Sequence, residues 1–179
     1  MNYSWNWGVL FEQTGIGNEL YIHWMITGLG WLLLIGSIAW AIAMVVGTIF
    51  GIMRTLPNKA ARSIGTAYVT FFRNIPLLVQ LFFIAPGWLT PAIQDWWYKD
   101  LSPNTSAMLS ASIGLGLFTA ARIVEQVRTG IESLPEGQVN AAYALGFTIP
   151  QAYKEVLLPQ AFRIILPPLS SELTNCFKN

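Results

Sequence analysis

Residues 24–53 read WMITGLGWLLLIGSIAWAIAMVVGTIFGIM, a run without a single charged side chain. A helix of about 20 apolar residues crosses the hydrocarbon core of a bilayer. Residues 74–94 and 101–121 are equally free of charge. Lipid offers no partners for backbone polar groups, so each run must be helical where it crosses. The sequence therefore predicts an all-α integral membrane helical bundle with three full spans and, after residue 159, a partial fourth.

The overall composition excludes several other classes of protein. Hydrophobic residues make up 54% of the chain and charged residues 11%, whereas soluble domains carry roughly 25% charged residues. The net charge of +1 argues against a nucleic-acid partner. The single cysteine, Cys176, excludes an internal disulfide and a cysteine metal cluster. The first twenty residues contain Glu12 and Glu19 but no lysine or arginine, so they lack the basic start of a signal peptide.

Charge asymmetry predicts the orientation of the chain in the membrane. Arg54, Lys59 and Arg62 follow the first run, while residues 1–20 carry no positive charge. By the positive-inside rule the link after the first run is cytoplasmic and the N-terminus lies outside. Three crossings then deliver residues 133–159 to the cytoplasm. We find no repeat or soluble linker, and expect residues 1–179 to form one membrane domain whose last span is incomplete.

Residues 133–159 are more polar than their flanks and predict a hairpin of two short helices. Ser133 and Glu136 have the spacing of a capping box, which would start the first helix. Gly146 is a natural stop, because glycine readily adopts the left-handed conformation found at helix ends.

The second helix of the hairpin is expected to start at Thr148, which has capping-box spacing to Gln151, and to end at Pro159. Small residues on the first helix would permit close approach by a partner surface. One face is predicted to carry Ala141, Ala142 and Leu145. We interpret the hairpin as a docking element, the alternative being a surface helix without a partner.

Three stretches carry a resemblance to a known family. The order Asn140-Ala141-Ala142, Gly146 and Leu157-Leu158-Pro159 resembles the EAA loop of bacterial ABC importer permeases, although Asn140 stands where that family usually has glutamate. Residues 72–80 (FRNIPLLVQ) are similar to the polar amino-acid uptake branch, the histidine/glutamate/arginine type. Within that branch, residues 118–128 (FTAARIVEQVR) most resemble the glutamate/aspartate permeases.

The resemblance implies a permease subunit of an ATP-driven importer for glutamate or aspartate in the bacterial inner membrane, with a periplasmic N-terminus and no enzymatic activity. It implies three partners: a cytoplasmic ATPase dimer, a second homologous permease and a periplasmic amino-acid-binding protein. The chain has no Gly-x-x-x-x-Gly-Lys-Ser/Thr loop, so ATP would be bound by the ATPase subunits and no cofactor by this chain. The family continues for about two further spans, so the chain is expected to be C-terminally incomplete. The residues that would couple to the ATPase are Asn140, Ala141, Ala142, Leu145, Gly146 and Pro159.

Arg122 is the principal candidate for substrate binding. It follows an apolar run, at a depth where a charged side chain generally faces a bundle interior or a water-filled path. Its guanidinium suits bidentate binding of a carboxylate. The alternative is an ion pair with Glu125, three residues further along the same helix. Glu125 itself would either line the pathway or lock the cytoplasmic end of the third span. Thr119 and Gln126 would either contact substrate or bond to a neighbouring helix.

Other polar residues are weaker candidates. Arg73 is interpreted as an anchor at the lipid surface. Glu172 and Asn175 lie in the last span, which we expect Pro167-Pro168 to interrupt, and broken helices often mark transporter sites.

Two other functions stay open on the sequence alone. A gradient-driven secondary transporter would need acidic residues within its spans, and the three charge-free runs contain none. A truncated, non-transporting membrane protein is the other alternative. No catalytic set and no metal-ligand pattern is legible.

Overall fold

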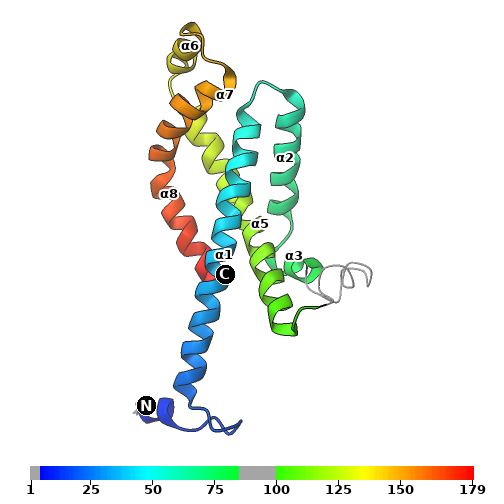
Figure 1. Cartoon of the computed structure of the whole chain (residues 1–179), viewed down its shortest axis with the longest axis vertical. Helices are drawn as coiled ribbons and strands as arrows, with labels where there is room; N and C mark the ends of the chain where they lie inside the picture. Colours follow the sequence, from blue (N-terminus) through cyan, green and yellow to red (C-terminus); the bar gives the residue numbers. More distant parts are fainter. Residues whose placement is uncertain (1–4, 85–99) are drawn as a thin grey trace, which may run out of the picture.

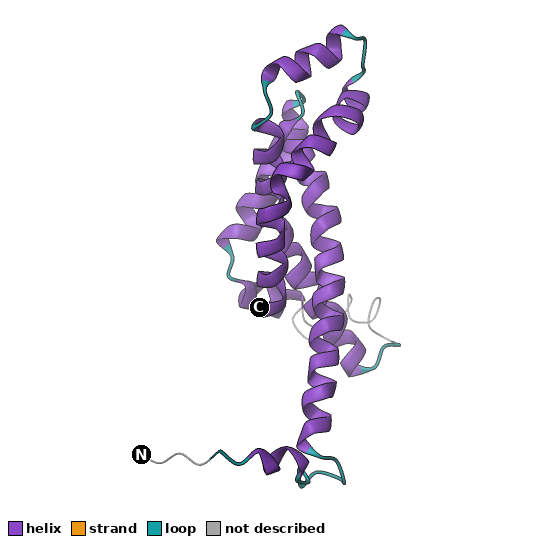
Figure 2. Cartoon of the chain, turned by 90° about the vertical axis from the view of Figure 1, so that its left-hand side faces the viewer, coloured by secondary structure: helices purple, strands orange, loops and turns teal. Residues whose placement is uncertain are grey.

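The structure is a computed structural model that describes residues 5–84 and 100–179. These residues are almost entirely helical (Figures 1 and 2), with one isolated bridge between Gln13 and Leu20. In chain order the elements are η1 (Trp7–Phe11), α1 (Tyr21–Thr55), α2 (Lys59–Asn74), α3 (Leu77–Ile84), α5 (Pro103–Glu132), α6 (Glu136–Ala144), α7 (Ile149–Gln151), the π-helical η3 (Ala152–Leu157) and α8 (Leu158–Lys178).

Helices α1 and α5 confirm two of the predicted spans. Each is long and apolar enough to cross a membrane, and the described residues hold a third span if α2 and α3 count as one bent crossing. The axes of α2 and α3 meet at 103°. The rest of the second predicted span, beyond residue 84, lies outside the described residues.

The bend between α2 and α3 follows from Pro76. Proline has no N–H to offer the carbonyl four residues earlier, and it favours an extended residue before it, as Ile75 is at φ −105° and ψ 125°. Gln80, which is buried, replaces the missing donor. Its Nε2 donates to the carbonyl oxygens of Phe72 and Ile75, both at 2.8 Å. Both backbone carbonyl oxygens at the break therefore have a hydrogen-bond donor.

Glycines allow α1 and α5 to pack closely. A Cβ built on Gly47 would lie 2.6 Å from the Cβ of Ile123, and one on Gly51 would lie 2.6 Å from the Cβ of Val127. Membrane helices pack without a hydrophobic driving force between them, so close approach of small residues is what holds them together. By contrast, a Cβ on Gly28 meets nothing within 4 Å.

Helix α8 packs along α5 and forms the third wall of the core. Its inward residues Ile165 and Leu169 join the buried cluster that also contains Ile123 of α5. The predicted interruption at Pro167-Pro168 is wrong, because α8 stays helical through both residues. The φ of proline is compatible with a helix and its cost is mainly the lost backbone bonds. The buried residues on either side hold the adjacent turns against α5.

The hairpin stands at the end of the molecule opposite η1 (Figure 1). Its predicted stop at Gly146 is confirmed: this residue has φ +84°. The N–H of Phe147 donates to the Ala142 carbonyl at 3.1 Å, and that of Gly146 to the Tyr143 carbonyl at 2.9 Å, which completes a Schellman motif.

Two predicted boundaries of the hairpin are wrong. Ser133 does not cap α6, because its hydroxyl donates to the Gly130 carbonyl at 2.8 Å and Pro135 occupies the N-cap position. Pro159 does not end a helix either. It lies in the first turn of α8, which follows α7 and η3 without a break. The π-helical turn Ala152–Leu157 precedes it, and its backbone bonds do not follow the i to i−4 pattern that a proline interrupts.

The second predicted capping box is confirmed. The backbone N–H of Thr148 donates to Gln151 Oε1 at 2.9 Å. At the base of the hairpin, the Tyr153 hydroxyl donates to Thr55 Oγ1 at 3.1 Å and ties η3 to the end of α1. Burial raises the pKa of Tyr153, so its hydroxyl stays a donor at neutral pH.

Candidate functional site

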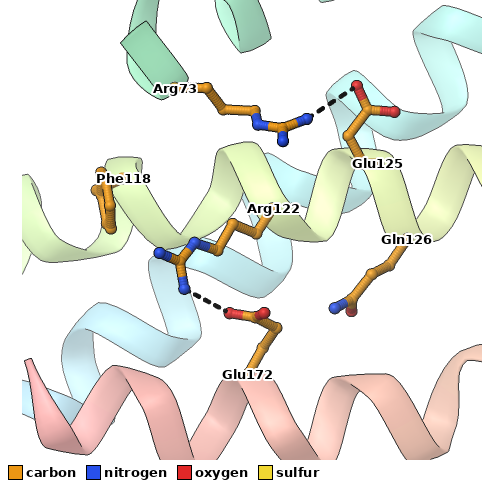
Figure 3. A pocket seen from close by; sticks show the side chains of 6 residues that line it. All are labelled: Arg73, Phe118, Arg122, Glu125, Gln126 and Glu172. Carbon is orange, nitrogen blue, oxygen red and sulfur yellow. Dashed lines mark hydrogen bonds and ion pairs between the residues drawn. The ribbon is translucent and has the colours of Figure 1, made fainter. Parts of the chain in front are cut away.

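An open cavity of about 460 Å³ lies between the end of α2 and the facing sides of α5 and α8. Its lining contains two arginines, two glutamates, one amide and one aromatic ring (Figure 3). The lining residues are Arg73, Phe118, Arg122, Glu125, Gln126 and Glu172. Four of them recur at helical spacing on one side of α5, which brings together three of the four residues predicted from the sequence to bind substrate.

Arg122 points across the cavity toward α8 (Figure 3). Its Nη1 lies 3.4 Å from Glu172 Oε2, and its guanidinium carbon lies 5.0 Å from the centre of the Phe118 ring. Its side chain is 40% exposed. The alternative predicted from the sequence, an ion pair with Glu125, is wrong, because the Glu125 carboxylate is directed away from Arg122 and pairs with Arg54 and Arg128. Arg122 therefore keeps donors available toward the cavity.

Glu125 is bound by arginines from two helices. Its Oε1 accepts a hydrogen bond from Arg54 at the end of α1, and its Oε2 accepts one from Arg128 Nε at 3.0 Å. Arg128 also pairs with Glu132 at 2.6 Å. This network joins the ends of α1 and α5, as expected if Glu125 locks the end of the span.

Arg73 and Glu172 are the two cavity residues that the sequence interpretation underrated. Arg73 lines the cavity, where its side chain is 58% exposed and its Nη1 lies 3.9 Å from Glu125 Oε1. The bend at Pro76 sets the direction of the turn that carries Arg73. Glu172 is brought opposite Arg122 because α8 continues through its two prolines. Its side chain is 15% exposed.

The structure places Gln126 and Thr119 in different surroundings. Gln126 lines the cavity, donates from Nε2 to the Pro168 carbonyl at 3.5 Å, and has a buried Oε1 without a hydrogen-bond partner among the described residues. Thr119 is buried on α5 and does not line the cavity.

The predicted coupling residues are mostly at the surface of the hairpin. Leu145 is 77% exposed. The other exposed members are Asn140, Ala141, Gly146 and Pro159. Ala142 is 3% exposed and faces the rest of the chain, so the prediction that it shares the outer face with Leu145 is wrong. Ala142 is one residue from Ala141, and a step of one residue turns a helix by about 100°.

No group of three potential metal ligands occurs within residues 5–84 and 100–179.

Comparison with known proteins identifies the family of the chain. A family model described as "Binding-protein-dependent transport system inner membrane component" matches residues 43–179. The chain belongs to this family.

Comparisons with individual proteins give the same family. The chain is 48% identical over 182 residues to the glutamate/aspartate import permease protein GltJ of Escherichia coli (strain K12), a match that covers all of this chain and 74% of that protein. It is 36% identical over 155 residues to the glutamate/aspartate import permease protein GltK of Escherichia coli O6:H1, covering 84% of this chain and 66% of that one. A crystal structure of an amino acid ABC transporter with histidines matches with a TM-score of 0.63 at 28% identity, covering 88% of this chain and 69% of that one.

Family membership confirms several predictions made from the residues. The protein is the membrane permease subunit of an ABC importer, a transport component and not an enzyme. The helical-bundle fold and the resemblance carried by residues 72–80, 118–128 and 140–159 are confirmed with it. The gradient-driven alternative has no support.

Proposed function

We propose that this permease subunit moves glutamate and aspartate through the cavity that Arg122 faces. The observation that carries the proposal is the guanidinium of Arg122, 40% exposed and lining a cavity of about 460 Å³, in a chain 48% identical to a glutamate/aspartate permease. Arginine is always charged and presents a planar set of donors that matches a carboxylate. A charged side chain inside a membrane bundle is costly, and where one occurs it generally marks a substrate or ion pathway.

The other cavity residues divide into two groups in this proposal. Gln126 offers an unpaired acceptor to the substrate. Glu125, whose two oxygens are held by Arg54 and Arg128, acts as a positioning residue at the pathway wall. Thr119, which is buried on α5, contributes to helix packing beside the pathway.

The hairpin is proposed to dock on a cytoplasmic ATPase dimer. Leu145 is a large apolar side chain left exposed at the tip, next to the exposed Ala141 and Asn140. Gly146 ends α6 and Pro159 starts α8, so both set the shape of this surface, while Ala142 anchors α6 from within. Closure of the ATPase dimer would then move the hairpin as a rigid body and switch the spans between outward and inward access.

Three further features belong to the proposal. The similarity to both GltJ and GltK supports pairing with a second, homologous permease. A periplasmic amino-acid-binding protein would deliver the substrate. Residues 1–179 form one membrane domain with a periplasmic N-terminus, and residues 133–159 are cytoplasmic, which is supported by Arg54, Lys59 and Arg62 lying toward the same end as the hairpin.

Uptake of radiolabelled glutamate by cells expressing the chain with its partner subunits tests the proposal. Arg122→Gln keeps a polar side chain but removes the charge. We expect glutamate uptake to fall by about tenfold, the lower range for losing a hydrogen bond to a charged group. Arg163→Gln is the matched control, because Arg163 is exposed on α8 outside the cavity. Unchanged uptake and unchanged selectivity over glutamine in Arg122→Gln would show that the proposed role is wrong.

A further inference from the structure

The cavity presents charges of both signs at separate points. Arg122 and Glu172 face each other from α5 and α8, and Arg73, on α2, points toward Glu125 in the same cavity wall (Figure 3). The fourth charged lining residue, Glu125, has both carboxylate oxygens occupied by hydrogen bonds from arginines. Arg73 is held by Glu125 only through a long contact of 3.9 Å, and its side chain is 58% exposed. The charges left to face a ligand are therefore the two positive charges of Arg73 and Arg122 and the negative charge of Glu172.

Glu172 is free to exchange its partner. Within the described residues it makes one ion pair, a single contact of 3.4 Å to Arg122 Nη1. A charge-assisted hydrogen bond between nitrogen and oxygen is ordinarily about 2.7–2.9 Å long. A loose pair of this kind leaves lone pairs on the carboxylate and donors on the guanidinium for a third group.

Gln126 adds an independent sign of a missing donor. Its Oε1 is buried and has no hydrogen-bond partner among the described residues, although it lines the same cavity as Glu172. A buried polar atom without a partner is costly and rare in folded proteins. A ligand with several N–H donors would satisfy this acceptor together with the Glu172 carboxylate.

We propose that Glu172 binds the ammonium group of an amino dicarboxylate whose two carboxylates are bound by Arg73 and Arg122. The inference rests on the proposed function, in which the cavity takes acidic amino acids. Glutamate at neutral pH carries two negative carboxylates and one positive ammonium, the opposite of the charge at each of the three points. A dicarboxylate without the amino group would hold an anion against the mostly buried Glu172, and such a repulsive contact gives specificity.

A simpler role for Glu172 makes a different prediction. If Glu172 only neutralised Arg122, its removal would change the affinity for every dicarboxylate by the same factor. If it binds the ammonium, its removal selectively weakens the ligand that has one. The ratio of two affinities therefore distinguishes the roles.

The experiment uses the purified complex of permease and ATPase subunits, with the periplasmic protein omitted so that the selectivity measured is that of the membrane part. Bound radiolabelled L-glutamate is competed with glutarate, which has the same carbon chain and both carboxylates but no ammonium. We expect the wild type to prefer glutamate over glutarate by about tenfold. In Glu172→Gln the preference should fall to roughly twofold or less. Glu155→Gln is the matched control, because this glutamate also forms an ion pair, with Lys154, but lies outside the cavity and outside the Glu125 network.

Arg73 is tested with 4-aminobutyrate, which keeps the ammonium and one carboxylate. Arg73→Gln should lower the preference for glutamate over 4-aminobutyrate by about tenfold. An unchanged preference would remove Arg73 from the site.

Three outcomes decide the inference about Glu172. Glutamate binding with an unchanged glutamate-to-glutarate ratio in Glu172→Gln would overturn it while leaving the proposed function intact. A wild-type complex that binds and transports neither glutamate nor aspartate would overturn both. If Glu172→Gln does not fold, Glu172→Asp keeps the charge on a side chain one methylene shorter. It should weaken glutamate more than glutarate, and equal losses would refute the role.

Discussion

Gly47 offers the sharpest test of how this bundle is held together. A Cβ at this position would lie 2.6 Å from both Cβ and Cγ2 of Ile123 and 3.1 Å from the Ala120 carbonyl oxygen. Carbon atoms pack at about 3.5–4.0 Å, so Gly47→Ala must push α1 and α5 apart by about 1 Å at this level. Overpacking of this kind costs about 1–3 kcal/mol.

The assay is the apparent melting temperature of the purified protein in detergent. For a chain of this size about 2 kcal/mol corresponds to a drop of roughly 4–8 °C. Gly28→Ala is the matched control on the same helix, because a Cβ there meets nothing within 4 Å and alanine is the better helix former. It should leave the melting temperature unchanged or slightly raised.

A second substitution refines the test of this contact. Ile123→Ala removes Cγ2 but leaves the Cβ at 2.6 Å, so it should rescue Gly47→Ala only partly. If Gly47→Ala melts with the wild type, the close approach of α1 and α5 is not needed and the packing argument fails. Full rescue by Ile123→Ala would place the clash at Cγ2 alone and contradict the geometry.

Two further predictions concern the bend and the hairpin. Gln80→Leu keeps the side-chain volume but leaves the Phe72 and Ile75 carbonyls without their buried donor. We expect a loss of about 2 kcal/mol in stability, seen as a lower melting temperature. An unchanged melting temperature would mean that Pro76 alone sets the bend. Leu145→Asp should abolish transport-coupled ATP hydrolysis. The melting temperature should not fall, because this side chain is 77% exposed. The control Lys154→Asp, also at an exposed position, should retain coupling. Normal coupling in Leu145→Asp would argue against docking through the tip of the hairpin.

Local features of the fold were predictable from the sequence where one residue acts on its own neighbours. Gly146 ends a helix because glycine accepts a positive φ. Thr148 is capped by a side chain three residues away. The boundaries expected at Ser133 and Pro159 failed for the converse reason. Each residue had two locally acceptable positions, and the packing of α5 and α8 selected the one that the spacing did not favour.

The candidate site was predictable in part. Arg122 stood out because a charge after a long apolar run is costly wherever it lies, and the structure places it in the cavity. Its partner was not predictable. The nearest acidic residue in the sequence, Glu125, accepts a hydrogen bond from Arg54 instead, which is 71 residues away. The partner that Arg122 does take, Glu172, is 50 residues away on another helix.

The sequence by itself determined that the chain crosses a membrane, which family it resembles, and the helix end at Gly146 and helix start at Thr148. These properties depend on the solvation of each segment and on motifs whose residues lie within a few turns of one another. Only the tertiary structure decided which charges face one another, because ion pairs depend on how α1, α2, α5 and α8 are placed around each other. The same placement brings Arg73 and Glu172, which were weaker candidates from the sequence, into the wall of the cavity. A charged side chain shows from sequence alone that it needs a partner, but the packing of the helices chooses that partner.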